Sequence, residues 1–237
     1  MSKKIIFKPS ISEEYLAGDI PVPAVKAMPE WFKKFKRYFG EENKLDFGSA
    51  GNINLTIKAC HPATDAMSSG YMISLRNDLF VKKNERGRLT VSWPNGGDNF
   101  VSTHSDQQIP PEMIPIGCDP QVFKFDNVWS IILPRGYSAL ITHPLNRNDL
   151  PFISLAGVVD LDTYHDTVGL PFFFKEQAYG IIPAGTPIAQ VFPFKRESWV
   201  SEISNYDAKF SNAQKSKIKS KIEKGYRLFN WKRKDFK

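Results

Sequence analysis

Three carboxylates, an aromatic ring and an imidazole lie within residues 155–166, LAGVVDLDTYHD. Asp160 and Asp162 are two positions apart, so in a strand their side chains would share one face. That arrangement is typical of a paired-carboxylate site, but Asp side chains also accept hydrogen bonds from the amides of tight turns. Tyr164 and His165 follow directly. The stretch is therefore predicted to form a hairpin that carries either a site or only a turn.

A second polar stretch, THPLNRNDLPF at residues 142–152, holds more polar side chains than a plain loop needs. His143, Asn146 and Arg147 are its candidate ligand-binding residues. Two histidines and two aspartates from these stretches, or His104, could bind a divalent metal. The histidines lie in separate segments, however, without an H-x-x-x-H spacing. We therefore assign no metal ligand, and the cofactor stays unknown.

The elements that must position these groups read as a β-rich core over residues 51–197. The chain has 18 Phe, 17 Pro and 15 Gly, which suits short aromatic strands joined by turns. Pro134-Arg135-Gly136 and Pro183-Ala184-Gly185 are predicted turns, and residues 84–88 and 94–99 are predicted loop tips. HPATDAMSSGY at residues 61–71 is either a pocket loop or a tight strand entry. We expect strands within residues 53–60, 70–83, 88–93, 129–144, 152–161, 168–174 and 186–194.

Residues 1–50 are predicted to form an extended arm with a short helix. Residues 6–11, IFKPSI, suit an edge strand, and Pro29 suits the first turn of a helix over residues 29–39. Aromatic residues recur on that helix at helical spacing, with lysines between them. The helix either anchors the chain to a membrane or nucleic acid, or packs its aromatic face on the core.

Residues 198–237 lose the strand pattern and are predicted to form a basic helical tail. Residues 195–237 hold 13 Lys/Arg and 5 Asp/Glu, a balance of +8, whereas the whole chain carries +7. Ser211 or Asn212 could cap a helix over residues 213–224, with Gly225 ending it. The lysines form either a solvated face or a surface that contacts the phosphates of nucleic acid.

The bulk composition indicates a globular protein. Of 237 residues, 41% are hydrophobic and 24% charged, which allows a sizeable core. Cys60 and Cys118 give neither a disulfide framework nor a zinc pattern. The start of the chain does not read as a signal peptide, and no segment approaches the ~20 apolar residues of a membrane span. We expect a cytoplasmic protein without membrane contact.

Four segments resemble, in order, motifs of the dUTPase family and its dCTP-deaminase relatives. SSGYMISLRNDLFV at residues 68–81 is similar to the first motif, and LPRGYSALI at residues 133–141 to the segment before the second. AGVVDLDTY at residues 156–164 resembles the third motif, and IPAGTPIAQVF at residues 182–192 the fourth. The resemblance implies a mainly β protein with a β-clip core, a homotrimer whose ligand clefts lie between subunits.

The same resemblance implies roles for individual residues. Asp160 matches the carboxylate that activates a water for attack on the triphosphate, so it is the candidate catalytic residue. Tyr164 matches the tyrosine under the sugar, one position late. Tyr71 and Gln190 lie in the segments similar to the first and fourth motifs and join the ligand-binding candidates. Asp162 and His165 are also ligand-binding candidates.

Departures from the family pattern argue against dUTP hydrolysis. Met72 stands where the family has an Asp, and residues 143–146 align with P-R-S-G without its Arg and Ser. The glycine-rich final motif is missing from the tail. A triphosphate needs several positive groups or backbone N–H donors to offset its charge. We therefore do not expect the family's hydrolysis of dUTP.

The chain also resembles an uncharacterised group of phage and bacterial proteins that share DAM-x-x-GY, THPLNR-x-DLPF and GVVD-x-D. Two functions follow as hypotheses. One is binding of a small polar ligand, such as a nucleotide, in a cleft of the homotrimer. The alternative is a non-enzymatic phage assembly component, located in the virion or the host cytoplasm, with the arm and the tail contacting particle neighbours. Nucleic-acid binding by the basic tail is a third.

Overall fold

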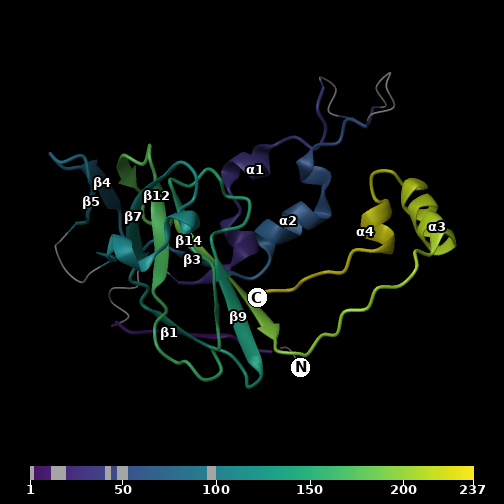
Figure 1. Cartoon of the computed structure of the whole chain (residues 1–237). Helices are drawn as coiled ribbons and strands as arrows, with labels where there is room; N and C mark the ends of the chain where they lie inside the picture. Colours follow the sequence, from purple (N-terminus) through teal and green to yellow (C-terminus); the bar gives the residue numbers. More distant parts are fainter. Residues whose placement is uncertain (1–2, 12–19, 41–43, 47–52, 95–99) are drawn as a thin grey trace.

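The computed structural model describes residues 3–11, 20–40, 44–46, 53–94 and 100–237 (Figure 1). This part of the chain is mainly β, as expected, and its strands form antiparallel sheets. Residues 95–99 of the predicted loop tip, and residues 1–2, 12–19, 41–43 and 47–50 of the N-terminal arm, lie outside the described residues. Short 3-10 turns lie between the helices and strands: Ala24–Ala27, Ile57–Ala59, Asp106–Gln108 and Pro111–Met113.

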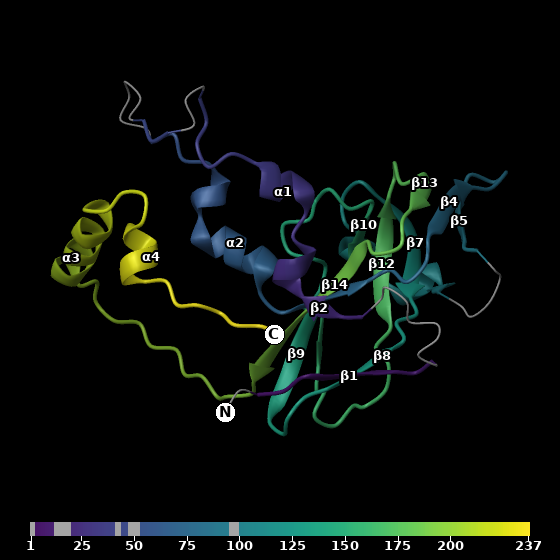
Figure 2. The same ribbon diagram turned by 180° about the vertical axis from the view of Figure 1, so that it is seen from behind.

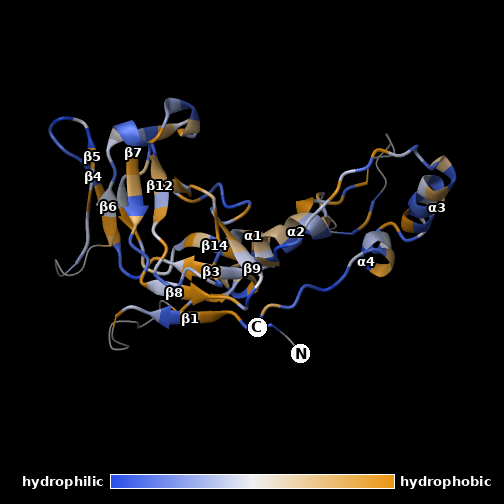
Figure 3. Ribbon diagram, turned by 60° about the horizontal axis from the view of Figure 1, so that its bottom comes forward, coloured by the Kyte–Doolittle hydropathy of each residue, from blue (hydrophilic) through white to orange (hydrophobic). Residues whose placement is uncertain are grey.

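A five-stranded sheet forms the centre of the molecule and holds the segments that carry most candidate residues. Its order is β11-β9-β14-β3-β2. The longest member, β14, lies between β9 and β3, and its first five residues are buried. Hydrophobic residues follow the strands of this sheet (Figure 3). The strands are β2 (Val22–Pro23), β3 (Tyr71–Ser74), β9 (Tyr137–Thr142), β11 (Gly157–Val159) and β14 (Pro187–Lys195).

A four-stranded sheet packs a phenylalanine cluster, which explains the abundance of this residue. Phe125 and Phe172 stack with ring centroids 3.7 Å apart, and Phe123 meets Phe174 edge-on at 4.8 Å. These rings are fully or almost fully buried. Their edge-on and stacked contacts stabilise the fold in addition to the stabilisation from the apolar area that they remove from water. The sheet has the order β10-β12-β7-β6. Its strands are β6 (Val101–Thr103), β7 (Cys118–Phe125), β10 (Phe152–Ser154) and β12 (Leu170–Lys175).

Two small sheets complete the β structure. The edge strand predicted in residues 6–11 is present as β1 (Ile6–Pro9), which pairs with β8 (Trp129–Ile132). β4 (Leu79–Lys83) and β5 (Leu89–Ser92) form a hairpin, and β13 (Gly180–Ile182) pairs with the other edge of β4. The tip of the hairpin is the turn predicted at residues 84–88, where the Asn84 side chain accepts two backbone N–H groups.

Both predicted Pro-x-Gly turns are confirmed. The Tyr137 N–H donates to the carbonyl of Pro134, and Gly136 has φ +85°. The Thr186 N–H donates to the carbonyl of Pro183, and Gly185 has φ +81°. A residue without a Cβ adopts this backbone conformation without steric cost, so these glycines let β8 turn into β9 and β13 into β14.

Two predictions upstream of β3 are wrong. Residues 53–60 form no strand; they hold a 3-10 turn and bridge positions at Ile53 and Leu55, the latter pairing with Tyr38. Residues 61–71 begin as a helix, α2 (His61–Ser68), rather than as a loop. Pro62 lies in the first turn of α2, where its missing N–H costs nothing. Gly70 then turns the chain into β3 with φ +77°.

The aromatic helix near the N-terminus is shorter than predicted. It spans α1 (Glu30–Lys34), with Pro29 at its N-cap, and Phe35 is already extended. Phe32 is buried, whereas Trp31, Phe35 and Phe39 are 46%, 46% and 60% exposed. One ring, rather than an aromatic face, therefore fixes this helix to the core.

The predicted hairpin at residues 155–166 is also wrong. β11 pairs with β9, which precedes it in the chain, and the next strand, β12, joins the other sheet. Residues 160–164 form a turn, in which the Tyr164 N–H donates to the Asp160 carbonyl at 2.9 Å. This turn carries the chain from one sheet to the next.

The C-terminal part leaves the sheets after β14 and returns to α2 (Figures 1 and 2). Residues 196–207 are extended and lead to α3 (Ala208–Lys219), which begins earlier than predicted because Asp207, not Ser211 or Asn212, caps it. Gly225 starts α4 (Gly225–Phe229) instead of ending a helix. None of the described helices is both long and apolar enough to cross a membrane.

Candidate functional site

Asp160 and Asp162 converge on the guanidinium of Arg196. Asp160 follows β11 and Arg196 follows β14, so the ends of two strands of the central sheet bring them together. Arg196 Nη1 lies 3.2 Å from Asp160 Oδ1 and 2.9 Å from Asp162 Oδ1, and Nη2 donates to Asp162 Oδ2. The two carboxylates lie together, although in the turn after β11 rather than on one face of a strand, and they hold a cation supplied by the protein itself.

The two carboxylates have different surroundings. The Asp162 side chain is 3% exposed and also accepts the Gly136 N–H at 2.7 Å. The Arg196 guanidinium, followed by the Gly136 N–H, lowers the pKa of Asp162 to about 2. The Asp160 side chain is 63% exposed and accepts the Ser138 hydroxyl at 2.6 Å. Asp162 therefore fastens the end of β14, while Asp160 keeps an accessible face.

Tyr164 and His165 support the turn rather than the carboxylate pair. The Tyr164 hydroxyl donates to the Thr167 carbonyl at 3.2 Å, and its ring is 46% exposed. His165 Nε2 lies 3.2 Å from the backbone carbonyl of Asp162. Both contacts stay within the turn. Neither side chain completes a site around Asp160 within this chain.

His143 and its neighbours form a second group at the opposite end of β9. The Ser154 N–H donates to Nδ1 at 3.3 Å, so Nε2 carries the proton and donates to the Arg147 carbonyl at 3.2 Å. Burial lowers the pKa of His143, which favours the neutral form of the ring. Asn146 adopts φ +59°, and its amide reaches the Ala63 carbonyl at 3.4 Å. The group shapes the loop after β9.

Arg147 and Gln190 are structural links within this second group. The Arg147 guanidinium forms two 2.9 Å contacts with the carboxylate of Asp149. Gln190, which is fully buried, accepts the Leu145 N–H at 2.9 Å. Its amide donates to the carbonyls of α2 and the residues just beyond it, Ala66 at 2.9 Å and Ser69 at 2.7 Å. Gln190 therefore joins three separate segments, and all its polar atoms are engaged.

The side chains of Tyr71 and His104 have other partners. The Tyr71 ring sits edge-on between Phe7 and Phe236, and its hydroxyl donates to the Lys237 carbonyl at 3.2 Å. Burial raises the pKa of Tyr71. His104 Nδ1 contacts the Gln108 side chain at 2.8 Å. The C-terminal residues, rather than a ligand, thus cover Tyr71.

The candidate residues do not form one site within a single chain. Ser138, which contacts Asp160, lies near the start of β9, and His143 follows its end. At ~3.3 Å per residue the two groups are about 16 Å apart along the strand. Among the described residues, no group of three or more His, Cys, Asp or Glu could hold a metal ion.

Arg196, Ser138 and the Gly136 N–H are the partners that the sequence analysis missed. Arg196 is 34 residues from Asp162 and follows an apolar strand, so no local motif links them. The signal present in the sequence is a cation just after the apolar strand predicted at residues 186–194.

Comparisons with known proteins give little. No protein-family model and no curated protein matches the sequence. Among solved structures, a mutant of the dUTPase from phage phi11 of S. aureus is similar, with a TM-score of 0.30 and 16% identity. The match covers 61% of this chain and 84% of that chain. At this TM-score the likeness carries no argument, so the proposals below depend on the contacts of this chain.

Proposed function

We propose that the protein is a non-enzymatic assembly component that binds further copies of itself through a C-terminal arm, residues 197–206. The observation that carries this proposal is the exposure of the arm's apolar side chains. Trp199, Val200 and Ile203 are 87%, 95% and 101% exposed. Contiguous apolar side chains of this size on a surface are typical of an interaction site.

The energetics favour covering the arm. Burying a large apolar side chain stabilises by about 1.5–3 kcal/mol, so three give on the order of 5–8 kcal/mol if a partner covers them completely. The backbone has the same need. None of the described residues forms a backbone hydrogen bond with residues 197–206. An extended peptide in this state can add as a strand to an open sheet edge.

We propose the groove between β5 and β6 as the acceptor on the second copy. Both are edge strands of their sheets. The groove is lined by residues of both edges, among them Val91, Trp93 and Thr103. Trp93 Nε1 is buried and has no hydrogen-bond partner in the described structure. A backbone carbonyl of an inserted arm would satisfy this N–H, which otherwise carries a desolvation penalty.

The proposed assembly is a homotrimer on a β-clip core of the dUTPase type, in the virion or the host cytoplasm. The four motif-like segments of the sequence support this part. A closed ring of three arms would leave no free arm and no open groove, because each subunit donates one and accepts one.

The test is the oligomeric state of arm variants, measured by size-exclusion chromatography with light scattering. The wild type is expected to be a multimer, and the triple substitution Trp199→Ser, Val200→Ser, Ile203→Ser to be monomeric with unchanged circular dichroism. Ile116→Ser is the matched control, because Ile116 is 103% exposed outside the arm. A monomeric wild type, or a triple variant that keeps the wild-type mass, would refute the proposal.

A second candidate function is binding of a small polar ligand, such as a nucleotide, at Asp160. The observation that favours it is the exposed Asp160 carboxylate beside a guanidinium that is 40% exposed. Together they offer an acceptor and a charged donor. Calorimetric titration with dUTP and dUMP should give binding that Asp160→Asn weakens and Asp166→Asn leaves unchanged. Absence of heat with either nucleotide would remove this candidate.

A further inference from the structure

The excess positive charge of the chain gathers on α3, α4 and the turn between them, residues 207–230, which we term the basic segment. It holds seven Lys and Arg against two acidic residues. The acidic pair is engaged elsewhere: Asp207 caps α3, and Glu223 accepts the Tyr38 hydroxyl at 2.6 Å. Within the described structure, none of the seven basic residues forms an ion pair.

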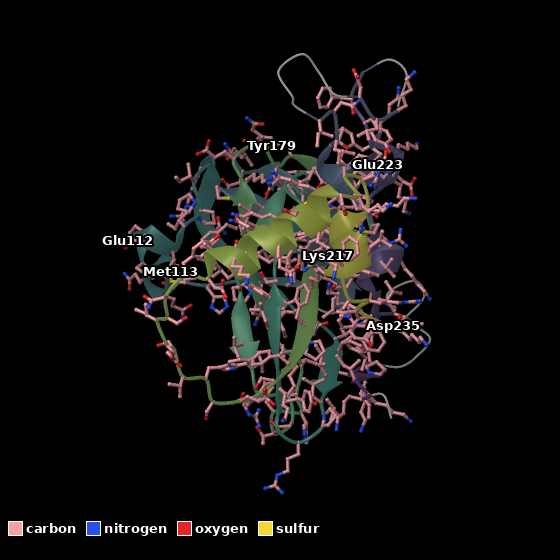
Figure 4. All side chains as sticks on the ribbon, turned by 90° about the vertical axis from the view of Figure 1, so that its right-hand side faces the viewer. Glu112, Met113, Tyr179, Lys217, Glu223 and Asp235 are labelled. Atoms are coloured by element: carbon pink, nitrogen blue, oxygen red, sulfur yellow. The ribbon has the colours of Figure 1, made fainter. Side chains whose placement is uncertain are left out.

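The basic segment has a defined shape. α3 and α4 pack against each other, and Lys217 Nζ lies 4.9 Å from the centre of the Phe229 ring. At the corner, a Cβ on Gly225 would lie 2.0 Å from the Ile218 carbonyl oxygen, so only glycine fits there. Figure 4 shows Lys217 on the helix that lies in front of the sheets when the molecule is seen from this side. The charges are therefore presented on a fixed surface.

Contacts at its far end hold the basic segment against the body. The Arg37 guanidinium donates to the Glu223 carbonyl at 3.0 Å. Beyond α4, the Trp231 indole N–H donates to Asp65 of α2 at 2.8 Å, and Lys234 pairs with the same carboxylate at 2.5 Å. These contacts hold the basic segment in one position on the body, which a solvated tail without a role would not need.

Exposed aromatic rings lie among the lysines. Tyr206 and Phe210 are 71% and 64% exposed, and Phe229 is 37% exposed. Every nucleobase has a flat face that stacks on such rings, while cationic side chains neutralise the phosphates between them. In a duplex the bases are already stacked, so exposed rings favour an unpaired strand.

We propose that the basic segment binds single-stranded nucleic acid, with its lysines on the phosphates and Phe210 and Tyr206 on the bases. A membrane surface fits less well. A helix that lies in a membrane surface buries a continuous apolar face. On α3 the only large apolar side chain that is mainly exposed is Phe210, while Ile218 is partly covered. Tyr206 is the last residue of the C-terminal arm, but the self-association proposal depends on Trp199, Val200 and Ile203. Either proposal can therefore fail alone.

The test is fluorescence anisotropy of a labelled 20-nucleotide oligo(dT) titrated with the full chain at several salt concentrations. The affinity is expected to fall as salt rises, with a log–log slope of about −0.7 for each phosphate contacted. The double substitution Lys215→Glu, Lys219→Glu should raise the Kd about tenfold or more, and Phe210→Ala about fivefold or more.

The matched control is Lys26→Glu, Lys82→Glu, which makes the same charge change at two exposed lysines of the body. This variant should keep the wild-type Kd within about threefold, and circular dichroism should be unchanged in all variants. Three results would overturn the proposal: no binding of oligo(dT), equal losses in the control and the basic segment, or tighter binding to duplex DNA or to vesicles with 30% phosphatidylserine.

Discussion

Replacing Gln190 by leucine tests whether this buried amide is a structural link or a ligand group. Leucine has a similar size, so the main change is the loss of three hydrogen bonds, to the Leu145 N–H and to the carbonyls of Ala66 and Ser69. At about 1 kcal/mol net for each bond, the variant should lose about 3 kcal/mol of unfolding free energy. The cost rises where the freed groups stay away from water. Urea denaturation followed by tryptophan fluorescence measures the loss.

A second substitution, Gln190→Glu, adds a pH dependence. A carboxylate still accepts the Leu145 N–H but faces two carbonyls without a proton to donate, whereas the protonated acid can donate to one of them. Burial should raise the pKa of the new carboxyl above about 4.3, so its penalty grows as the pH rises through that raised value. The difference from wild type should thus be smaller at pH 4 than at pH 7.

Gln177→Leu is the control, because Gln177 is exposed, and it should change the unfolding free energy by less than about 0.5 kcal/mol. If Gln190→Leu unfolds at the wild-type urea midpoint, the three hydrogen bonds do not join these segments in solution. A penalty of equal size at pH 4 and pH 7 would show that the Gln190→Glu carboxyl is not confined between the carbonyls.

Three other substitutions test the packing and the charge pair. Gly70→Ala should lower the melting temperature sharply, since φ is +77° and the methyl would lie 2.3 Å from the Val191 carbonyl oxygen; an unchanged melting temperature would contradict this close approach. Phe172→Ala should cost about 3–5 kcal/mol in urea, because the ring is fully buried against Phe125; a loss below about 1 kcal/mol would exclude tight packing. The pKa of Asp162 is lowered to about 2, so its ionised form stabilises the fold above about pH 4 and this contribution fades toward pH 2. The difference in stability between wild type and Asp162→Asn should therefore shrink as the pH falls from about 4 to about 2, as measured by acid titration followed with circular dichroism. A stability difference that does not depend on pH would show that the charge of Asp162 is irrelevant.

Most of the β core could be predicted because its signals are local, but β6 and β7 were missed. Alternating apolar residues and the Pro-x-Gly turns at residues 134–136 and 183–185 each depend on a few neighbouring residues. The helix at residues 61–68 was missed because its mixed sequence lacks a clear apolar stripe, although Pro62 suits a first helical turn. Similarly, Asp207 is four residues ahead of Ser211, and both types cap helices, so the sequence left the start of α3 open.

The candidate site was predictable only in part. The spacing of Asp160 and Asp162 correctly indicated that they lie together. Their common partner, Arg196, comes from a strand whose register is set by the whole sheet, and no local spacing records that pairing. Gln190 was predicted to bind a ligand because it lies in the segment similar to the fourth motif, and no local spacing indicated its structural role. Its three partners lie in segments that only the folded chain brings together.

The C-terminal part of the chain is fastened at two points, by Arg196 where it leaves the sheet and by Trp231 where it returns to α2. One cut by a protease between residues 197 and 206 would therefore not release the downstream fragment under native conditions. The nicked molecule would migrate as one species in a native gel and as two bands after denaturation. A cleavage site inserted there would thus give a two-piece protein whose pieces stay associated until the fold is denatured.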